Sequence, residues 1–266
     1  MIPKIIHYCW FGRNPLPPLA LECIASWKKY LPDYEIKEWN EDNFDVNIIP
    51  YTAEAYKQNK YAFVSDYARF WIMYKYGGIY FDTDVEVIRP MDDIIAKGNF
   101  MGFEVDPDGE NTPGKYAPRF CFDVALGLGF GMEKEHPFIK KMKDYYINLE
   151  FQGATMNPWL KTIVAYTTEK LMDEGLENKS GIQHVGDIWV YPHEYFAPIN
   201  VITCRLHITS NTRTVHRYMG SWDSSGKKEF TKLTIKEMIL MAKKIMPEKI
   251  LLMLNKLKRR RYVIKD

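Results

Sequence analysis

The hydrophobic pattern at the start of the chain alternates between the spacing of strands and that of a helix. The β-prone run KIIHYCW at 4–10 predicts a strand, which glycine and proline residues at 12–18 end. Apolar residues then recur at helical spacing over 19–31 and alternate again over 34–39. The order strand, helix, strand favours a parallel sheet with crossover helices, so the pattern predicts an α/β fold.

A helix and a strand follow each other directly in the next segment. The segment VSDYARFWIMYKYGG at 64–78 predicts a helix with Ser65 as its N-cap and the two glycines at its end. The run IYFDTDVEVI at 79–88 predicts a strand that carries Asp82 and Asp84 one residue apart. Side chains alternate along a strand, so we expect both carboxylates to point the same way.

Later segments give weaker patterns. Over 92–125 the periodicity fades, and the polar composition of 104–119 predicts a loop. The run GLGFG at 127–131 predicts a turn, followed by a helix from about 136. Two further expectations are a helical segment within 153–180 and a strand with a loop over 184–198.

Charge divides the chain into an acidic body and a basic tail. The net charge of +2 splits into +8 in residues 232–266, which hold eleven lysines and arginines and three acids, and −6 in residues 1–231. The tail interleaves Ile, Leu and Met with lysines, breaks at Pro247 and has a basic block at 258–261. An interfacial helix on an anionic membrane has this composition, and so does a helix docked on the body. We predict two domains, 1–231 and 232–266, and no nucleic-acid partner, because the body is acidic.

Composition and cysteine positions favour a reduced globular protein. Apolar residues make up 46% and charged residues 26% of the 266, which is enough to bury a core. The four cysteines are scattered without a C-x-x-C pair, so neither a disulfide framework nor a zinc finger is predicted. The N-terminus lacks the pattern of a signal peptide, and no apolar run approaches the length of a membrane span. We expect a cytoplasmic location.

Two pairs of polar residues flank the double glycine and are candidates for a site. Asp82 and Asp84 suit a hard cation, although acids at a strand end also serve simply as solubilising groups. Asp66 and Arg69, three apart on one helix face, can pair with each other or together grip a ligand rich in hydroxyls. All four groups approach the carboxyl end of a strand, where open α/β sheets bind ligands. The combination favours a ligand site over two separate surface features.

Three stretches of the sequence resemble glycosyltransferase family 32: IPKIIHYCWFG at 2–12, SDYARFWIMYKYGGIYFDTDVEVI at 65–88 and VHRYMGSW at 215–222. The second stretch is the most specific, since it holds S-D-x-x-R, G-G and D-x-D in fixed order. The resemblance implies a GT-A fold, with a central mostly parallel sheet and flanking helices, joined here to the basic amphipathic tail. It also implies a nucleotide-sugar donor, a divalent metal and retention of the anomeric configuration.

The resemblance also implies roles for individual residues. Asp82 and Asp84 form the D-x-D element, with Asp84 as the direct metal ligand and Asp82 nearer the donor ribose and sugar. Asp66 and Arg69 match the pair that holds the donor sugar, and the arginine also matches a contact to phosphate or sugar oxygens. Trp10 matches the ring that stacks on the donor base; a core indole is the alternative.

The late segment carries the remaining implied roles. His216 is the candidate for a further metal ligand, and a plain surface histidine is the alternative. Ser221 matches a metal or phosphate contact, and Trp222 matches a donor-phosphate contact through its indole N–H. The distantly similar glucosylating domains of large clostridial toxins space this serine and tryptophan differently.

The implied chemistry is the stabilisation of a departing nucleoside diphosphate. A divalent cation on both phosphates acts as a Lewis acid, and carboxylate ligands favour Mn²⁺ or Mg²⁺ over zinc. The GLGFG run is too compact for a phosphate loop, so the metal and Arg69 take that role. No acid is nominated as a covalent nucleophile from spacing, so we expect front-face displacement in which the leaving phosphate accepts the proton. Glu104 and Asp123 are candidates for the acceptor side.

Two other classes of protein share part of this pattern. A haloacid-dehalogenase-like phosphohydrolase would make Asp82 a phosphorylated nucleophile, but VGDIW at 185–189 poorly matches the acidic pair that it needs. A noncatalytic sugar-binding module is the second alternative. We expect instead a hexosyl or N-acetylhexosaminyl transferase of surface or capsular polysaccharide synthesis. Its donor is expected to be a UDP-linked sugar, with a guanosine-linked sugar, as in the mannosyl branch of the family, as the alternative. Its acceptor is a glycan or a lipid-linked oligosaccharide, and its tail binds the inner face of the membrane.

Overall fold

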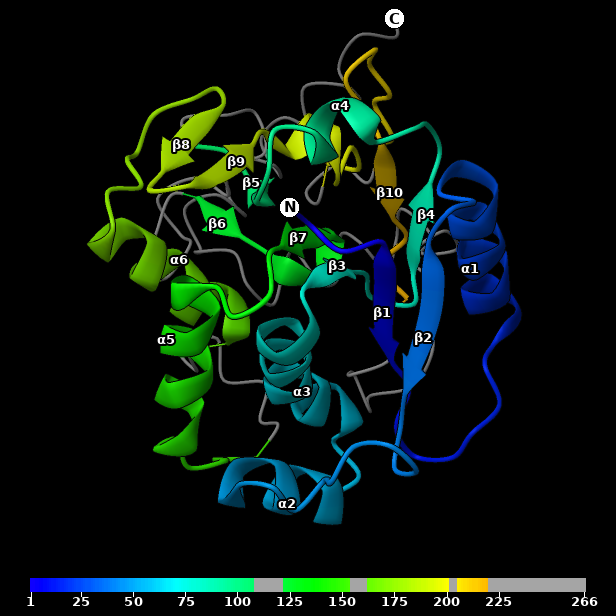
Figure 1. Ribbon diagram of the computed structural model, residues 1–266, viewed down its shortest axis with the longest axis vertical. Helices are drawn as coiled ribbons and strands as arrows, with labels where there is room; N and C mark the ends of the chain where they lie inside the picture. The colour runs from blue at the N-terminus through cyan, green and yellow to red at the C-terminus, as the bar shows by residue number, and fades with distance from the viewer. Residues whose placement is uncertain (108–121, 154–161, 201–204, 220–266) are drawn as a thin grey trace, which may run out of the picture. The chain divides into compact units, whose positions relative to one another are not determined.

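The computed structural model describes residues 1–107, 122–153, 162–200 and 205–219, which all belong to one compact unit, Met1–Trp222 (Figure 1). Within these residues an eight-stranded sheet has the order β2-β1-β3-β7-β5-β9-β8, with β6 paired to β5. Its strands are β1 (Ile5–Cys9), β2 (Glu35–Trp39), β3 (Gly78–Tyr80), β5 (Phe100–Val105), β6 (Asp123–Val124), β7 (Phe130–Met132), β8 (Gln183–Val185) and β9 (Ile188–Tyr191). The predicted tail and its boundary at 231 lie outside the described residues.

Most strands of the sheet run in one direction. β1 pairs in parallel with β2 and β3, and β5 pairs in parallel with β9. β7 joins these two groups and runs antiparallel to both β3 and β5, while β6 and β8 are also antiparallel to their neighbours. The prediction of an α/β fold with a mostly parallel central sheet, as expected of a GT-A fold, is confirmed.

Helices cover both faces of the sheet (Figure 1). They are α1 (Pro18–Tyr30), α2 (Pro50–Lys57), α3 (Tyr61–Tyr76), α4 (Asp92–Ile95), α5 (Pro137–Ile147) and α6 (Ile163–Asp173), with 3₁₀ turns η1 (Leu126–Leu128) and η2 (His193–Tyr195). One hydrophobic cluster joins the sheet to α2, α3, α5 and α6, and the other joins it to α1. None of the helices in the described part of the chain has the length and apolar character that crossing a bilayer requires.

A small second sheet lies on the α1 side. It consists of β4 (Val85–Val87) and β10 (Thr214–His216), which pair antiparallel. Trp27 of α1 is fully buried, and its indole N–H donates to the Val85 carbonyl oxygen at 2.7 Å. Because a buried indole needs a partner, this bond fixes β4 against α1.

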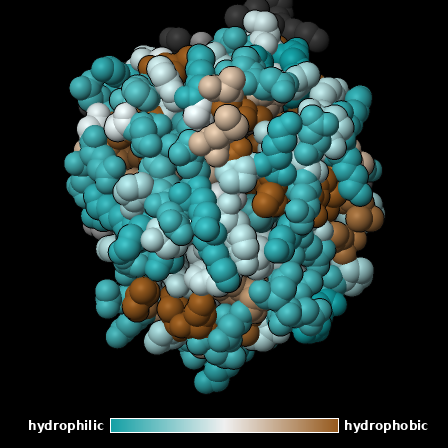
Figure 2. All heavy atoms as spheres, viewed as in Figure 1, coloured by the Kyte–Doolittle hydropathy of each residue, from teal (hydrophilic) through white to brown (hydrophobic). Residues whose placement is uncertain are grey.

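The face of the molecule in Figure 2 is mostly hydrophilic, with apolar residues in small separate groups.

Two local predictions around the double glycine were wrong. Helix α3 begins at Tyr61, and Ser65 lies inside it with its hydroxyl 3.2 Å from the Tyr61 carbonyl oxygen. The apolar face extends one turn further than expected, since Val64 is fully buried. The predicted strand 79–88 is interrupted, because β3 ends before Asp82 and β4 begins after Asp84. The helix end at Gly77, whose φ is 64°, is confirmed.

The sequence pattern also failed to predict one internal strand. β5 occupies 100–105, where the fading periodicity favoured irregular structure and a loop from 104. It lies between β7 and β9, and all of its side chains except Glu104 are buried. A strand covered on both faces shows no alternation of apolar and polar residues, so the pattern could not reveal it.

Candidate active site

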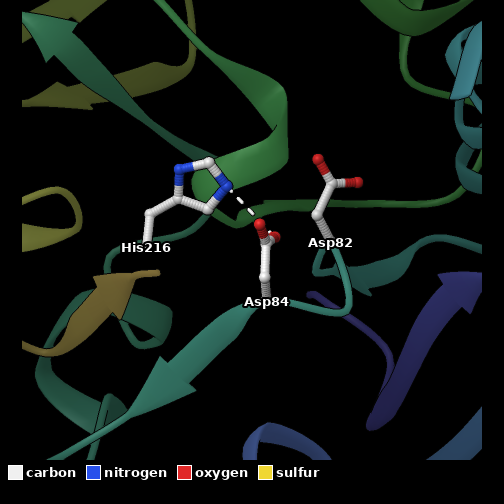
Figure 3. Close-up of side chains that lie close together, drawn as sticks. All are labelled: Asp82, Asp84 and His216. Atoms are coloured by element: carbon white, nitrogen blue, oxygen red, sulfur yellow. Dashed lines mark hydrogen bonds and ion pairs between the residues drawn. The ribbon is translucent and has the colours of Figure 1, made fainter. Parts of the chain in front are cut away.

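Asp82 and Asp84 lie in the turn that leaves the central sheet. The Val85 N–H donates to the Asp82 carbonyl oxygen at 3.1 Å, which closes the turn between β3 and β4. The two carboxylates therefore converge through a turn and not through the alternation of one strand. In Figure 3 they lie side by side, with the ring of His216 facing Asp84.

His216 reaches this turn from a distant part of the chain. The pairing of β10 with β4 sets His216 opposite Val85, the residue that follows Asp84. The His216 Nε2 lies 3.1 Å from Asp84 Oδ1. The Arg217 N–H donates to the Asp84 carbonyl oxygen at 2.8 Å. The Met219 N–H donates to Asp84 Oδ2, also at 2.8 Å. Both carboxylate oxygens of Asp84 are thus held in place.

Asp84 and His216 form a buried ion pair. Burial alone would raise the pKa of Asp84, but the charge and hydrogen bond of His216 outweigh it, and the pKa is lowered. Burial alone would lower the pKa of His216, but Asp84, with smaller effects from Glu104 and Asp82, raises it to about 9. Without a metal ion these shifts favour a carboxylate paired with an imidazolium, and a cation bound here would replace the ring proton.

The donor atoms of Asp82, Asp84 and His216 fit a divalent cation. One ligand atom from each residue lies within 4.8 Å of the other two. Two carboxylates and one imidazole form an oxygen-rich donor set of the kind that Mn²⁺ and Mg²⁺ take with water and phosphate oxygens. The fold thus brings together the three residues that the sequence nominated as metal ligands.

Arg69 connects this cluster to α3. Its side chain is 5% exposed, and one terminal nitrogen lies 3.3 Å from both Asp66 Oδ1 and Asp82 Oδ1. The guanidinium carbon also lies 4.8 Å from the centre of the Tyr80 ring. Burial alone would lower the pKa of Arg69. The charges of Asp82, Tyr80 and Asp66 outweigh burial and raise the pKa, so the guanidinium stays charged. Burial raises the pKa of Asp66 to about 7, although the Arg69 charge opposes this.

Gly127, in η1, lies against the carboxylate of Asp82. The Asp82 N–H donates to the Gly127 carbonyl oxygen at 3.2 Å. A Cβ at position 127 would stand 2.2 Å from Asp82 Oδ2, so this carboxylate has room only beside a glycine. Sequence reasoning predicted a turn for the GLGFG run and rejected it as a phosphate loop. Its glycine content was the one available signal, and it did not indicate which residue the glycine accommodates.

If Asp82 belongs to an active site, Gly127→Ala is expected to lower turnover on the order of a hundredfold, because a displaced catalytic group costs about this much. The Asp82 side chain is 31% exposed and can swing outward, so the fold should survive. Turnover and the thermal unfolding midpoint are measured together. The control is Gly175→Ala, where no atom lies within 4 Å and the positive φ affects stability alone. Unchanged turnover in Gly127→Ala would contradict the expectation.

The remaining predicted donor contacts are only partly visible. Trp10 directly follows β1, is half-buried, and donates from its indole N–H to the Asn14 carbonyl oxygen at 2.6 Å. Its predicted stacking on a base stays a prediction. Ser221 and Trp222 lie outside the described residues, and so do their predicted contacts.

Glu104 lies at an irregularity near the carboxyl end of β5. The register between β5 and β6 shifts around it, which leaves Glu104 as an extra residue on β5. Burial raises the pKa of Glu104, while the His216 charge and a hydrogen bond from Tyr218 oppose the rise. Burial also raises the pKa of Asp123 to about 7, and the Glu104 charge adds to it. A bulge beside a site re-aims a side chain, and here it brings a carboxylate toward the metal cluster.

Comparison with known proteins agrees with this geometry. Residues 17–101 match the family model described as glycosyltransferase sugar-binding region containing DXD motif. The chain is 35% identical over 139 residues to inositol phosphoceramide mannosyltransferase 3 of Schizosaccharomyces pombe, covering 46% of this chain and 39% of that protein. It is 32% identical over 209 residues to the uncharacterized glycosyltransferase L373 of Acanthamoeba polyphaga mimivirus, covering 76% and 75%.

Among solved structures, the PaToxG glycosyltransferase superimposes with a TM-score of 0.47 and 20% identity, covering 65% of this chain and 70% of that one. The chain spans about two fifths of the length of the yeast mannosyltransferase, so the activity of that whole protein does not transfer to it directly.

Proposed function

This chain belongs to the glycosyltransferases whose sugar-binding region contains a DXD motif, and on that premise we propose that it moves a hexosyl or N-acetylhexosaminyl group from a nucleotide sugar to a hydroxyl, with retention. Asp82, Asp84 and His216 would hold the divalent ion of this reaction. Their convergence within 4.8 Å, beside the buried Arg69, is the observation that carries the proposal. The phosphohydrolase and binding-module alternatives have no comparable support.

The residues around the proposed ion have different roles. When bound, Mn²⁺ or Mg²⁺ supplies Lewis-acid stabilisation of the diphosphate leaving group. Asp84 is held by His216 and by the Met219 N–H, so its orientation is set before the donor arrives. Arg69 fixes Asp82 and Asp66, which face the hydroxyls of the donor sugar in this proposal.

The acceptor side is proposed to include Glu104 and Asp123. Both carboxyl groups lie near the carboxyl end of β5, and burial raises the pKa of each, to about 7 for Asp123. The leaving phosphate accepts the proton of the attacking hydroxyl, so neither residue needs to act as a nucleophile. Unchanged turnover in both Glu104→Ala and Asp123→Ala would contradict this role.

The acceptor is proposed to be a glycan or a lipid-linked oligosaccharide of surface or capsular polysaccharide. A mannosyltransferase named for inositol phosphoceramide, a lipid, is among the relatives, which supports a lipid-linked acceptor. We expect residues 232–266, with a charge of +8, to bind anionic membranes at the inner face. Flotation with anionic vesicles should retain the full chain and lose a chain ending at 231. Equal flotation of both chains would contradict a role for the tail.

A panel of nucleotide sugars tests the proposed donor and metal together. Thermal stabilisation and donor hydrolysis are measured with UDP-linked and GDP-linked sugars, each with Mn²⁺, Mg²⁺ or a chelator. We expect one donor to stabilise the protein in the presence of the ion, by about 2.7 kcal/mol at a hundred times its Kd. A uridine donor is the expectation from sequence, and the mannosyltransferase relatives favour testing GDP-mannose first. No response to any donor would refute the proposal.

A further inference from the structure

His193 and Asp106 form a second pair of titratable side chains at the edge of the sheet. Asp106 directly follows β5, and His193 opens η2, two residues after the end of β9. The His193 Nδ1 lies 2.5 Å from Asp106 Oδ2, and the His193 backbone N–H donates to Asp106 Oδ1 at 2.7 Å. Two contacts to one carboxylate fix the position of the imidazole. The roles proposed above do not use this pair.

The pair lies at the same edge of the sheet as the metal cluster. β3 and β5 both run antiparallel to β7, which lies between them, so their carboxyl ends lie at one edge. β9 is parallel to β5, so the end of β9 lies there as well. In open α/β sheets this edge carries the ligand crevice. Asp82 follows β3, and the pair follows β5 and β9, so all of them lie at this edge of the sheet.

The contacts of β5 place this pair next to the metal cluster. Asp106 lies two residues after Glu104, so their Cα atoms are at most about 7 Å apart. Glu104 interacts with His216, a metal-ligand candidate, and with Tyr218. The distance from one acidic residue to the next is of the order of one sugar ring. A glycan that reaches the donor site past Glu104 would therefore pass close to the Asp106 end of the pair.

The ring of His193 keeps one nitrogen available. Its side chain is 23% exposed and that of Asp106 is 16% exposed. Among the described residues, Nδ1 has Asp106 as its partner and Nε2 has no hydrogen bond. When Nδ1–H donates to the carboxylate, Nε2 carries a lone pair that accepts a hydrogen bond from a hydroxyl. A hydroxyl-rich ligand is the class that this nitrogen suits.

Contacts other than the pair also hold η2 in place. The Ala197 N–H donates to the His193 carbonyl oxygen at 2.7 Å, and the Arg213 N–H donates to the Tyr195 carbonyl oxygen at 2.8 Å. The Thr214 hydroxyl also donates to the Phe196 carbonyl oxygen at 3.0 Å. These backbone contacts already join η2 to β10. The exposed edge of the His193 ring takes no part in these contacts.

We propose that His193 binds a hydroxyl of the acceptor glycan through Nε2, and that Asp106 is a positioning residue that orients the ring. The proposal rests on the proposed function, because it names the acceptor side of that same site. It gives the chain an acceptor contact that lies beyond the metal cluster, on the side of β5 and β9.

The test compares the KM for acceptor with the KM for donor in wild type, His193→Ala, His193→Gln and Asp106→Asn. The acceptor probes are the methyl glycosides of mannose, galactose, glucose and N-acetylglucosamine, and the donor is the nucleotide sugar that the panel identifies. His193→Ala is expected to raise the ratio of acceptor KM to donor KM at least about tenfold, the loss of one hydrogen bond from a fixed group. His193→Gln should restore part of it, and Asp106→Asn should raise the ratio less.

His184→Ala is the matched control, because His184 is exposed on β8 and its ring stacks on Trp189. It should leave the ratio unchanged. An unchanged ratio in both His193 variants, or equal rises in the two KM values, would overturn the inference and assign the pair a structural role. Absence of donor hydrolysis in the wild type would instead refute the proposed function, and this inference with it.

Discussion

The Asp84→Asn variant is expected to lose sugar transfer by on the order of a hundredfold to a thousandfold while keeping its fold. Asparagine has nearly the size of aspartate and still offers an oxygen to the Met219 N–H, which now lies 2.8 Å from Asp84 Oδ2. It removes the negative charge that faces His216 and one anionic ligand of the proposed cation. Preorganised charge at the leaving group is usually the largest contribution to catalysis, so its loss should dominate.

Transfer rate and Mn²⁺-dependent stabilisation by the donor are the measurements for this variant. Both should fall together, since the same carboxylate is proposed to support both. Asp33→Asn is the control, because Asp33 is an exposed acid paired with Lys4 on the surface. Transfer at the wild-type rate in Asp84→Asn would remove Asp84 from the metal site and leave the buried Asp84 and His216 pair with a structural role.

The Arg69→Met variant is expected to be less stable by about 3 to 5 kcal/mol at pH 8, the cost of breaking a buried ion pair. Methionine fills the space beside Tyr80 but leaves Asp66 and Asp82 without the cation that lies 3.3 Å from each. The unpaired charge of Asp66 should cost more stability than that of Asp82, because the Asp66 side chain is 13% exposed and the Asp82 side chain 31%. Sugar transfer should fall as well, since Asp82 loses its anchor.

The loss of stability in Arg69→Met should shrink as the pH falls. Burial already raises the pKa of Asp66 from 3.8 to about 7 against the Arg69 charge, and removing that charge raises the pKa further. The folded variant then binds a proton that the unfolded chain releases above pH 3.8, so its stability falls as the pH rises. Below that pH both states are protonated, and the cost of an unpaired carboxylate disappears.

Urea unfolding of wild type and Arg69→Met at pH 5 and at pH 8 measures this difference. The gap in the free energy of unfolding should be larger at pH 8. Arg13→Met is the matched control, because Arg13 forms an exposed pair with Asp42 and surface pairs contribute little. The same gap at both pH values would show that Asp66 does not carry the effect.

Much of the fold could be predicted from local patterns, and the exceptions have physical causes. The opening strand, helix and strand and the end of α3 at Gly77 depend on apolar spacing and on a left-handed glycine, which neighbouring residues encode. β5 was missed because both of its faces are covered. The strand that was predicted through Asp82 breaks because the chain leaves the central sheet there to pair with β10.

Part of the site could also be predicted from local patterns in the sequence. The spacing of Asp66 and Arg69 places them on one face of a helix, and the pair Asp82 and Asp84 stands out by its place after an apolar run. The enzyme class followed from the resemblance of those motifs to glycosyltransferase family 32. These features are set by short separations along the chain, so the sequence by itself determined them.

Only the tertiary structure shows which distant groups meet, although the resemblance had already nominated His216 as a metal ligand. His216 meets Asp84 across 132 positions, and His193 meets Asp106 across 87. Gly127 accommodates the Asp82 carboxylate from a different connection between strands. Each of these contacts depends on the register of strands and on the layers that cover them. No local pattern encodes that register, because it is set by the packing of the whole domain.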